Sequence, residues 1–403
     1  MSLLVYGARI VVGDARAEAY LGSVRIEADR IVEVGAGLEP RAGEQVIEAG
    51  GRVLLPGFVD AHTHAIYAGD RLDEFDLKQQ GQSYLQILAA GGGILATVRA
   101  VRQASVEALA EGLLQRLLVM LREGTTSVEV KSGYGLGTDD ELKLLRAIRL
   151  AATRFPGTLV PTALLGHALD PERPDLVERT LAETLPAVHA EFPGITVDAY
   201  CERGAWSVAD CRRLFERARE LGHPLRLHAD QFNALGGVEL ALELGALSVD
   251  HLEATSPAML ERLAESGTFG VLLPVSGFHT DDRYADARTF ADAGGQLVLA
   301  SNCNPGSAPS SSMPFVHALA LRKLGLSALE AIAATTSTAA RLLGLADRGT
   351  IAPGRRADLV LLRHHDPRLL GYEIGGNPVE RVVVAGREWP PIAKAGVSVP
   401  APE

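Results

Sequence analysis

The stretch that decides the fold is Leu54-Leu-Pro-Gly-Phe-Val-Asp-Ala-His-Thr-His64, an apolar run that ends in two histidines one residue apart. Side chains along a β-strand alternate between its two faces, so His62 and His64 are expected to point to the same side of a buried strand. Two imidazoles on one side can bind the same metal ion. The stretch therefore predicts a strand that carries part of a metal site.

Further along the chain, short apolar or β-branched runs alternate with longer amphipathic segments. Counting 57–64 as the first, the eight runs continue with 126–131, 158–166, 195–201, 224–228, 247–251, 270–274 and 296–301. The segment 105–123 has a leucine at every fourth position and Gly124 where a helix would end. Eight strand–helix units predict an α/β fold, a (β/α)8 TIM-type barrel over 56–344, with its chemistry at the carboxyl ends of the strands.

The two ends of the chain have a different pattern, of short alternating strands separated by turn signals. Residues 1–55 and 345–390 are each too short to bury a core alone, so we expect them to pair into one small β-sandwich domain built from both chain ends. Residues 391–403 are rich in Pro and Ala, and we expect them to form a poorly ordered C-terminal tail.

Composition narrows the functional classes. Of 403 residues, 47% are hydrophobic and 22% charged, with a net charge of −11 and three cysteines. A negative charge without a Lys/Arg-rich block argues against nucleic acid or membrane as a partner, and no apolar run reaches the roughly 18 residues of a membrane helix. The scattered cysteines and the lack of a secretory segment after Met1 indicate a reducing compartment. We expect a cytoplasmic protein that acts on a small molecule.

Two more histidines close strands of the predicted barrel. His228 ends the fifth run and His251 ends the sixth. Facing the pair on the first strand, they would complete a first-row metal site with an open position for water. A divalent metal lowers the pKa of bound water and polarises a carbonyl, which hydrolysis or deamination of an unreactive C–N bond requires. For the histidines in helical or loop contexts we expect packing or solvent: His189, His223, His317, His364 and His365.

Local motifs carry a resemblance that covers nearly the entire chain. In chain order they are His62-Thr-His64 with Gly69-Asp-Arg71, Ala90-Gly-Gly-Gly-Ile94, Val128-Glu-Val-Lys-Ser-Gly-Tyr-Gly-Leu136, Leu165-Gly-His167, Cys201-Glu-Arg-Gly204, His228-Ala-Asp-Gln231, Val249-Asp-His-Leu252 and Asn302-Cys-Asn-Pro-Gly-Ser307. Together they resemble the imidazolonepropionase family of the amidohydrolase superfamily. The resemblance implies hydrolysis of the cyclic amide C–N bond of 4-imidazolone-5-propanoate to N-formimino-L-glutamate, in histidine degradation, by a metal-activated water.

The same resemblance implies which residues form the site. The implied ligands of one divalent metal ion, zinc or iron, are His62, His64, His228 and Asn302. The implied substrate contacts are Arg71, Tyr134, His167, Gln231, Asn304, Gly306 and Ser307. The implied catalytic residues are His251, His167, Gln231 and Asn302. An arginine with a tyrosine can supply a charge-assisted grip on a propanoate, which agrees with the first two substrate contacts.

Two further features bear on this site. The glycines 91–93 would let the backbone approach a ligand closely, or they simply form a turn. Lys131 suggests the carboxylated lysine that bridges two metals in some amidohydrolases. It lies on the second strand by our count, whereas that lysine belongs on the fourth, so we expect a single metal.

At two positions where the family can have an acidic residue, this chain has an amide. Asn302 stands where the family has Asp, and Gln231 stands where Glu also occurs. Neither amide accepts a proton, so catalysis would depend on His251, His167 or metal-bound hydroxide. Losing a general base typically costs about 10² to 10⁴ in rate.

Three hypotheses therefore stay open. They are the cyclic-amide hydrolase, a deaminase of a heterocyclic amine, and a catalytically impaired binder that keeps the pocket. The deaminase would not need Arg71 and Tyr134 to hold a carboxylate. The oligomeric state is also open, with a homodimer as one candidate.

Overall fold

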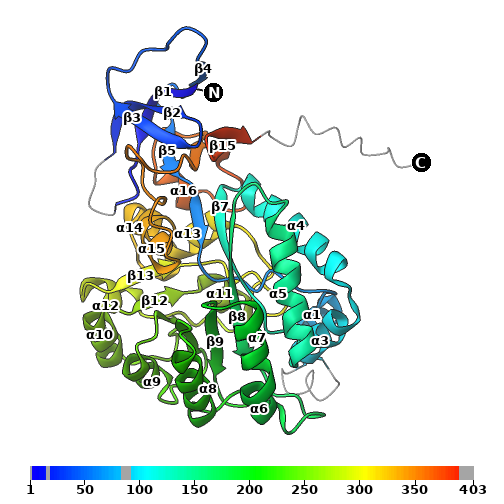
Figure 1. Cartoon of the computed structure of the whole chain (residues 1–403). Helices are drawn as coiled ribbons and strands as arrows, with labels where there is room; N and C mark the ends of the chain where they lie inside the picture. The colour runs from blue at the N-terminus through cyan, green and yellow to red at the C-terminus, as the bar shows by residue number, and fades with distance from the viewer. Residues whose placement is uncertain (1, 15–18, 83–91, 390–403) are drawn as a thin grey trace.

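The computed structural model describes residues 2–14, 19–82 and 92–389. A barrel fills most of the molecule, and a smaller sheet domain stands at one end of it (Figure 1). The expectations for the tail 391–403 and for Gly91 fall outside the described residues.

Eight parallel strands follow one another around the barrel in chain order. They are β6 (Phe58–Asp60), β7 (Thr125–Lys131), β8 (Thr158–Gly166), β9 (Thr196–Cys201), β10 (Leu225–Ala229), β11 (Ser248–His251), β12 (Phe269–Leu272) and β13 (Gln296–Leu299). Each strand pairs in parallel with the next. The predicted (β/α)8 barrel is confirmed.

Helices surround this sheet (Figure 1). Those before β10 are α1 (Leu72–Gln79), α3 (Ile94–Gln103), α4 (Val106–Arg122), α5 (Thr138–Ala152), α6 (Leu176–Arg179), a π-helical turn (Thr180–Thr184), α7 (Leu185–Glu191) and α8 (Val208–Glu220). Those after it are α9 (Gly237–Leu244), α10 (Pro257–Ser266), α11 (Pro274–Thr280), α12 (Ala287–Asp292), α13 (Met313–Lys323), α14 (Ala328–Ala334), α15 (Ser337–Leu342) and α16 (Leu369–Tyr372).

The first and last barrel strands meet at the rim where the chemistry was predicted. The backbone N–H of Asn302 donates to the carbonyl of His62, and that of His64 donates to the carbonyl of Cys303, each at 3.0 Å. The Asp60 carboxylate also accepts from the Ser301 N–H at 3.0 Å. The residues that join the two edges therefore include three of the predicted metal ligands, His62, His64 and Asn302.

The first predicted strand, 57–64, is wrong in its extent. β6 ends at Asp60, and His62 and His64 lie in the irregular segment after it. The residues before Gly57 form β5 (Val53–Pro56), which belongs to the other sheet. Beyond Asp60 the backbone forms hydrogen bonds on both sides. The Thr63 carbonyl accepts from the N–H of Lys131 at the end of β7, and the His62 carbonyl accepts from the N–H of Asn302 in the segment after β13. These bonds keep the segment extended without a strand ladder.

The two chain ends build one mixed sheet. It combines β1 (Ser2–Ile10), β2 (Tyr20–Glu27), β3 (Arg30–Gly35), β4 (Gln45–Glu48) and β5 with β14 (Leu359–Leu362), β15 (Val379–Val384) and β16 (Arg387–Trp389). The junction is the antiparallel pairing of β5 with β14. Leu3, Ile26 and Ile47 pack there with Leu359 in a core separate from that of the barrel. A shared β-domain from both ends is thus confirmed, as a continuous sheet.

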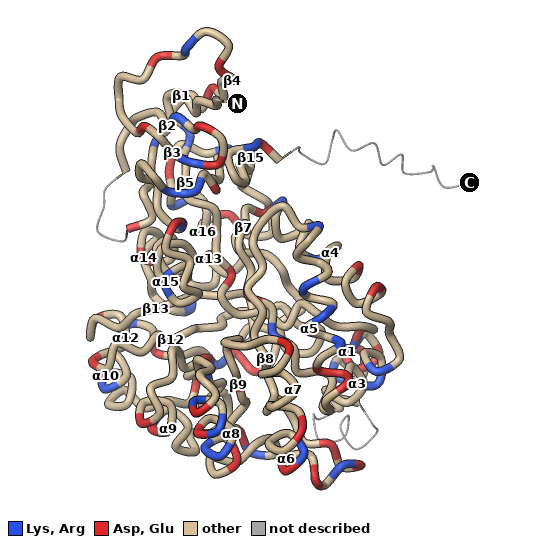
Figure 2. The backbone as a smooth tube through the Cα atoms, viewed as in Figure 1, with Lys and Arg blue, Asp and Glu red and all other residues tan. Residues whose placement is uncertain are grey.

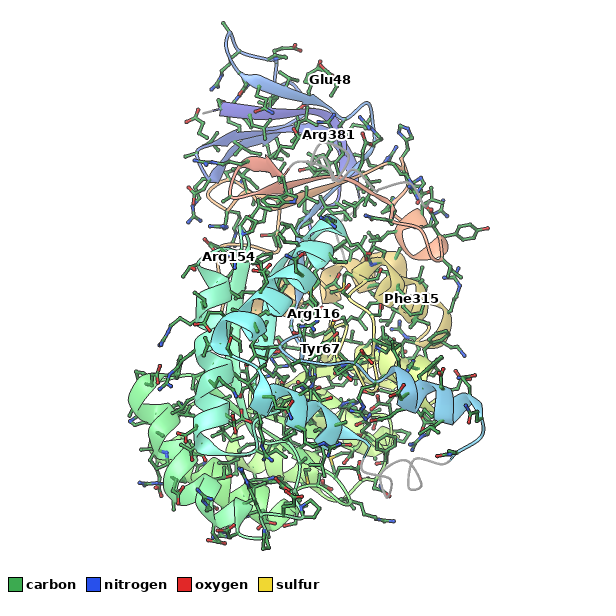
Figure 3. All side chains as sticks on the ribbon, turned by 90° about the vertical axis from the view of Figure 1, so that its right-hand side faces the viewer. Glu48, Tyr67, Arg116, Arg154, Phe315 and Arg381 are labelled. Carbon is green, nitrogen blue, oxygen red and sulfur yellow. The ribbon has the colours of Figure 1, made fainter. Side chains whose placement is uncertain are left out.

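Helix α4 forms where the leucine spacing predicts it and also supports the rim. The Ser105 side chain caps it by accepting from the Ala108 N–H. Figure 3 shows Arg116 of this helix beside Tyr67, and the guanidinium lies 3.4 Å from the ring centre. Arg116 also donates to the carbonyl of Ala65 at 3.0 Å. The helix therefore holds the segment that follows His64.

Acidic and basic residues alternate over the outer helices (Figure 2). Many form pairs between neighbouring helices, such as Arg212 with Glu243 at 2.6 Å and Arg146 with Glu191 at 2.6 Å. Within the described residues, every helix is too short or too polar to span a membrane.

Candidate metal centre

Three histidines from two strand ends converge inside the barrel rim. The Nε2 atom of His64 lies 3.2 Å from Nε2 of His62 and 3.3 Å from Nε2 of His228. All three side chains are buried. Three imidazole nitrogens this close could hold a metal ion and would leave a further coordination position open.

Two carboxylates fix the protons on this cluster. His62 Nδ1 lies 2.6 Å from Oδ2 of Asp250, and His228 Nδ1 lies 3.1 Å from Oδ1 of Asp198. A carboxylate only accepts, so each Nδ1 carries the proton and each Nε2 carries a lone pair. Burial, reinforced by the Lys131 charge, holds the pKa of both histidines well below the ordinary value. The cluster is therefore in the neutral form that binds metal.

Asn302, the predicted fourth ligand, lies next to His62 in the structure, because its backbone N–H donates to the His62 carbonyl at 3.0 Å. It follows β13 with a left-handed φ of 56° and is 2% exposed. Its Oδ1 has no hydrogen-bond partner among the described residues. A buried oxygen without a partner points to an ion or water that completes the site. Three imidazole nitrogens with an amide oxygen would suit a divalent cation.

A second imidazole–carboxylate pair borders the cluster. His251 ends β11 with φ of 93°, a strained conformation for a residue other than glycine. Its Nδ1 lies 3.1 Å from Oε1 of Glu253. Its ring centre is 5.8 Å from that of His228 and 6.2 Å from that of His62. His251 is therefore next to the metal-binding group without belonging to it.

Gln231 is held in one orientation at the end of β10. Its Oε1 accepts from the Tyr200 hydroxyl at 2.8 Å, and its Nε2 donates to Ser276 Oγ at 3.3 Å. The side chain has neighbours at both ends, so its carbonyl and amino groups have fixed directions. Tyr200 and Ser276 were not predicted, because neither stands in a motif.

His167 and Tyr134 lie next to His64. The His167 ring stacks on that of His64 at 5.0 Å, and the Tyr134 ring lies 5.2 Å from His167. His167 Nδ1 donates to the Gly133 carbonyl at 2.9 Å. Burial lowers the pKa of His167 to about 4, so it is neutral at pH 7 and its Nε2 is an acceptor.

Arg71 lies beside the loop that follows Asn302. Its Nη1 is 3.6 Å from the position that a Cβ on Gly306 would take. The guanidinium donates to Glu74 at 2.5 Å and to Thr97 at 3.3 Å, and its buried Nε has no partner among the described residues. Burial raises the pKa of Tyr134, and the nearby charge of Arg71 opposes this. Arg71 and Tyr134 therefore share one region of the site.

The loop itself is fixed by Asn304. Its Oδ1 accepts from the N–H groups of Gly306 and Ser307 at 2.8 and 2.7 Å, and its Nδ2 donates to the Asn302 carbonyl at 2.7 Å. The structure thus brings the predicted ligands, the predicted substrate contacts and His251 to one end of the barrel.

From the sequence, Lys131 was considered only as a possible bridging lysine, and the layer of buried charges beneath the histidines was not predicted. The charged side chains in it are Glu129, Lys131, Asp198, Arg226 and Asp250. A signal existed, since each of these residues interrupts a short apolar strand. Their mutual contacts depend on the barrel, and no local pattern gives them.

Comparisons with known proteins agree with this geometry. A family described as "Amidohydrolase family" matches residues 78–388. An imidazolonepropionase of Herpetosiphon aurantiacus is 45% identical over 379 residues, covering 90% of this chain and 89% of the relative. One of Symbiobacterium thermophilum is 45% identical over 380 residues, covering 91% and 89%.

Solved structures show the same fold at low identity. A triazine hydrolase variant superposes with a TM-score of 0.75 at 19% identity, covering 96% of this chain and 94% of that one. An atrazine chlorohydrolase from Arthrobacter aurescens, complexed with zinc, gives 0.71 at 18% identity with the same coverage.

Proposed function

Since this chain belongs to the amidohydrolase family and to the imidazolonepropionases within it, we propose that its histidine cluster is the centre at which it opens the ring of 4-imidazolone-5-propanoate. The reaction adds water across the cyclic amide C–N bond and gives N-formimino-L-glutamate. The observation that carries the proposal is the convergence of three imidazole Nε2 atoms at 3.2 and 3.3 Å, with the Nε2 lone pairs of His62 and His228 fixed by Asp250 and Asp198.

His62, His64 and His228 would hold one divalent ion, with Asn302 as a neutral fourth ligand. When bound, such an ion polarises the amide carbonyl and makes a water molecule a better nucleophile. Zinc and iron both suit a set of imidazoles with one oxygen.

Arg71 and Tyr134 would bind the propanoate of the substrate. A guanidinium offers paired donors to a carboxylate, and the Tyr134 hydroxyl adds another. Gly306 lets the substrate lie against Arg71, because its Cβ position is 3.6 Å from Nη1. Glu74 already shares this guanidinium, so the propanoate would bind beside it. This grip favours a carboxylated substrate over the heterocyclic amine of a deaminase.

His167 and Gln231 would both orient the ring. The neutral His167 offers Nε2 as an acceptor for a ring N–H, because its Nδ1 is bonded to Gly133. Gln231 offers Nε2 as a donor, because the Tyr200 hydroxyl occupies its Oε1. The loop held by Asn304, with Ser307 in it, would line the remaining side.

His251 would move the proton. As water adds to the carbonyl carbon, His251 takes a proton from it, and the Glu253 carboxylate stabilises the cation that forms. The proton then passes to the ring nitrogen as the C–N bond breaks. Asn302 and Gln231 act as ligand and donor, since an amide is no base at neutral pH.

The proposal is tested by turnover of imidazolone propanoate with metal-quantified protein, following loss of substrate and appearance of formiminoglutamate. We expect turnover that tracks metal content and no release of ammonia from aminated purines or pyrimidines. Metal-loaded protein that binds the substrate and leaves the ring closed would instead support the impaired binder.

We also propose that the enzyme works in the cytoplasm on this small molecule. The cysteines Cys201, Cys211 and Cys303 are all free and buried, which suits a reducing compartment.

A further inference from the structure

We propose that Lys131 is a positioning residue of the metal centre, because its ammonium pairs with three carboxylates that contact His62, His228 and the backbone next to His64. The inference rests on the metal site of the proposed function. It concerns a residue that touches neither the ion nor the substrate in that proposal.

The ammonium is fully enclosed in the barrel. Lys131 ends β7, and its side chain has no solvent exposure. Its Nζ lies 2.8 Å from Oε1 of Glu129, 2.8 Å from Oδ2 of Asp198 and 3.7 Å from Oδ2 of Asp250. One point charge therefore sits among three buried carboxylates from three different strands.

Each carboxylate continues to a different part of the cluster. Asp198 uses its other oxygen for His228 Nδ1 at 3.1 Å. Asp250 accepts from His62 Nδ1 at 2.6 Å. Glu129 uses Oε2 for the N–H of Thr63 at 3.2 Å, between the two histidines of the first strand end. A single carboxylate thus lies between the ammonium and each of His228, His62 and the backbone next to His64.

Arg226 provides the second cation of this layer. It donates to Asp250 at 2.6 Å and to Glu129 at 3.3 Å, and it donates to the Ala61 carbonyl at 2.9 Å. Asp198 receives its direct ion pair from Lys131. Arg226 cannot replace Lys131 there, so the orientation of His228 depends on the lysine.

A buried charge network is costly, and apolar residues of similar volume often serve stability as well or better. A purely structural role therefore explains this lysine poorly. Without the ammonium, Glu129 and Asp198 would face each other with no shared donor and would move apart. His228 would then lose the acceptor that fixes its Nε2 toward the cluster. Removing a group that orients a metal ligand typically costs 10- to 100-fold in metal affinity.

The test is metal retention, measured by transfer from the loaded protein to a chromogenic chelator. We expect Lys131→Met to release zinc or iron about 10- to 100-fold faster than wild type, with an unchanged circular dichroism spectrum. Arg25→Met is the matched control, because Arg25 is also a buried cation, paired with Glu33 and Glu44 in the composite sheet. The control should retain metal at the wild-type rate.

A second variant separates positioning from charge balance. Lys131→Met with Glu129→Gln removes one charge of each sign, and the amide oxygen can still accept from Thr63. We expect this double variant to fold and still release metal fast, because Asp198 has lost its partner. Wild-type retention in either variant, or failure of the double variant to fold, would overturn the inference. A wild-type protein that binds no metal would instead overturn the proposed function.

Discussion

Replacing Asn302 with Asp tests the one position where this chain departs from the family pattern. The change is nearly isosteric, and it adds a negative charge and a proton acceptor beside the three histidines. Asn302 is 2% exposed and its Oδ1 has no partner among the described residues, so the new carboxylate would be buried. Its effect should therefore depend strongly on whether the cation is bound.

The structure sets the expected magnitudes. In metal-free protein an uncompensated buried carboxylate should lower the free energy of unfolding by about 3 to 5 kcal/mol. In loaded protein the ion compensates this charge, so stability should match or exceed that of wild type. We expect kcat to rise about 100-fold, the low end of the 10² to 10⁴ contributed by a positioned base. The low end applies because His251 already offers a proton acceptor.

An opposing effect makes the result informative. An added negative charge weakens the pull of the ion on the substrate carbonyl, which would leave the rate unchanged or lower. The assay is kcat as a function of pH for both proteins at matched metal occupancy, with unfolding curves of the metal-free forms. The control for the added charge is Asn377→Asp. Asn377 lies on the surface, where its side-chain amide donates to the Arg122 carbonyl. An equal or lower kcat for Asn302→Asp at every pH would refute the reasoning.

Three other predictions follow from the same geometry. His228→Ala should remove the metal and abolish turnover while the barrel stays folded, and full metal occupancy in that variant would contradict the ligand assignment. Arg71→Ala should lower kcat/KM by the equivalent of about 1.5 to 3 kcal/mol, and a substrate without the carboxylate should be insensitive to the change. Burial lowers the pKa of His317 to about 3, so the unfolded chain binds a proton below its ordinary pKa of 6.5 while the folded protein does not. As the pH is lowered from 6.5 toward 3, the free energy of unfolding should therefore fall by up to about 1.4 kcal/mol per pH unit. Urea titrations of His317→Gln over this range should show a smaller fall.

The sequence predicted the barrel because its signals are local. The strand-end histidines and the leucine spacing of α4 each lie within one element, and repeated units fix the order of the sheet. The extent of the first strand could not be predicted, because β5 and β6 are consecutive in sequence yet belong to different sheets. Only the pairing of β5 with the distant β14 separates them.

The histidines that converge in the structure could be predicted from the sequence, whereas the side chains that orient them could not. His62, His64 and His228 stand at strand ends, where barrel chemistry is expected. Their partners Asp198 and Asp250 come from two other strands, and a buried carboxylate in a strand does not show which histidine it will meet. The role of Lys131 is further removed, since it requires three such carboxylates to be placed first.

The carboxylates also set His62 and His228, the proposed metal ligands, apart from His251, which is proposed to move a proton. Asp198 and Asp250 each pair with a cation, Lys131 or Arg226, so neither can fully stabilise a charged imidazole. Glu253 differs, because its Oε1 bonds His251 while its buried Oε2 has no partner among the described residues. An unshared carboxylate stabilises an imidazolium, whereas a shared one mainly orients a neutral ring. In the proposed mechanism the amides of Asn302 and Gln231 would therefore not leave the site without a base, because the unshared carboxylate of Glu253 lies beside His251.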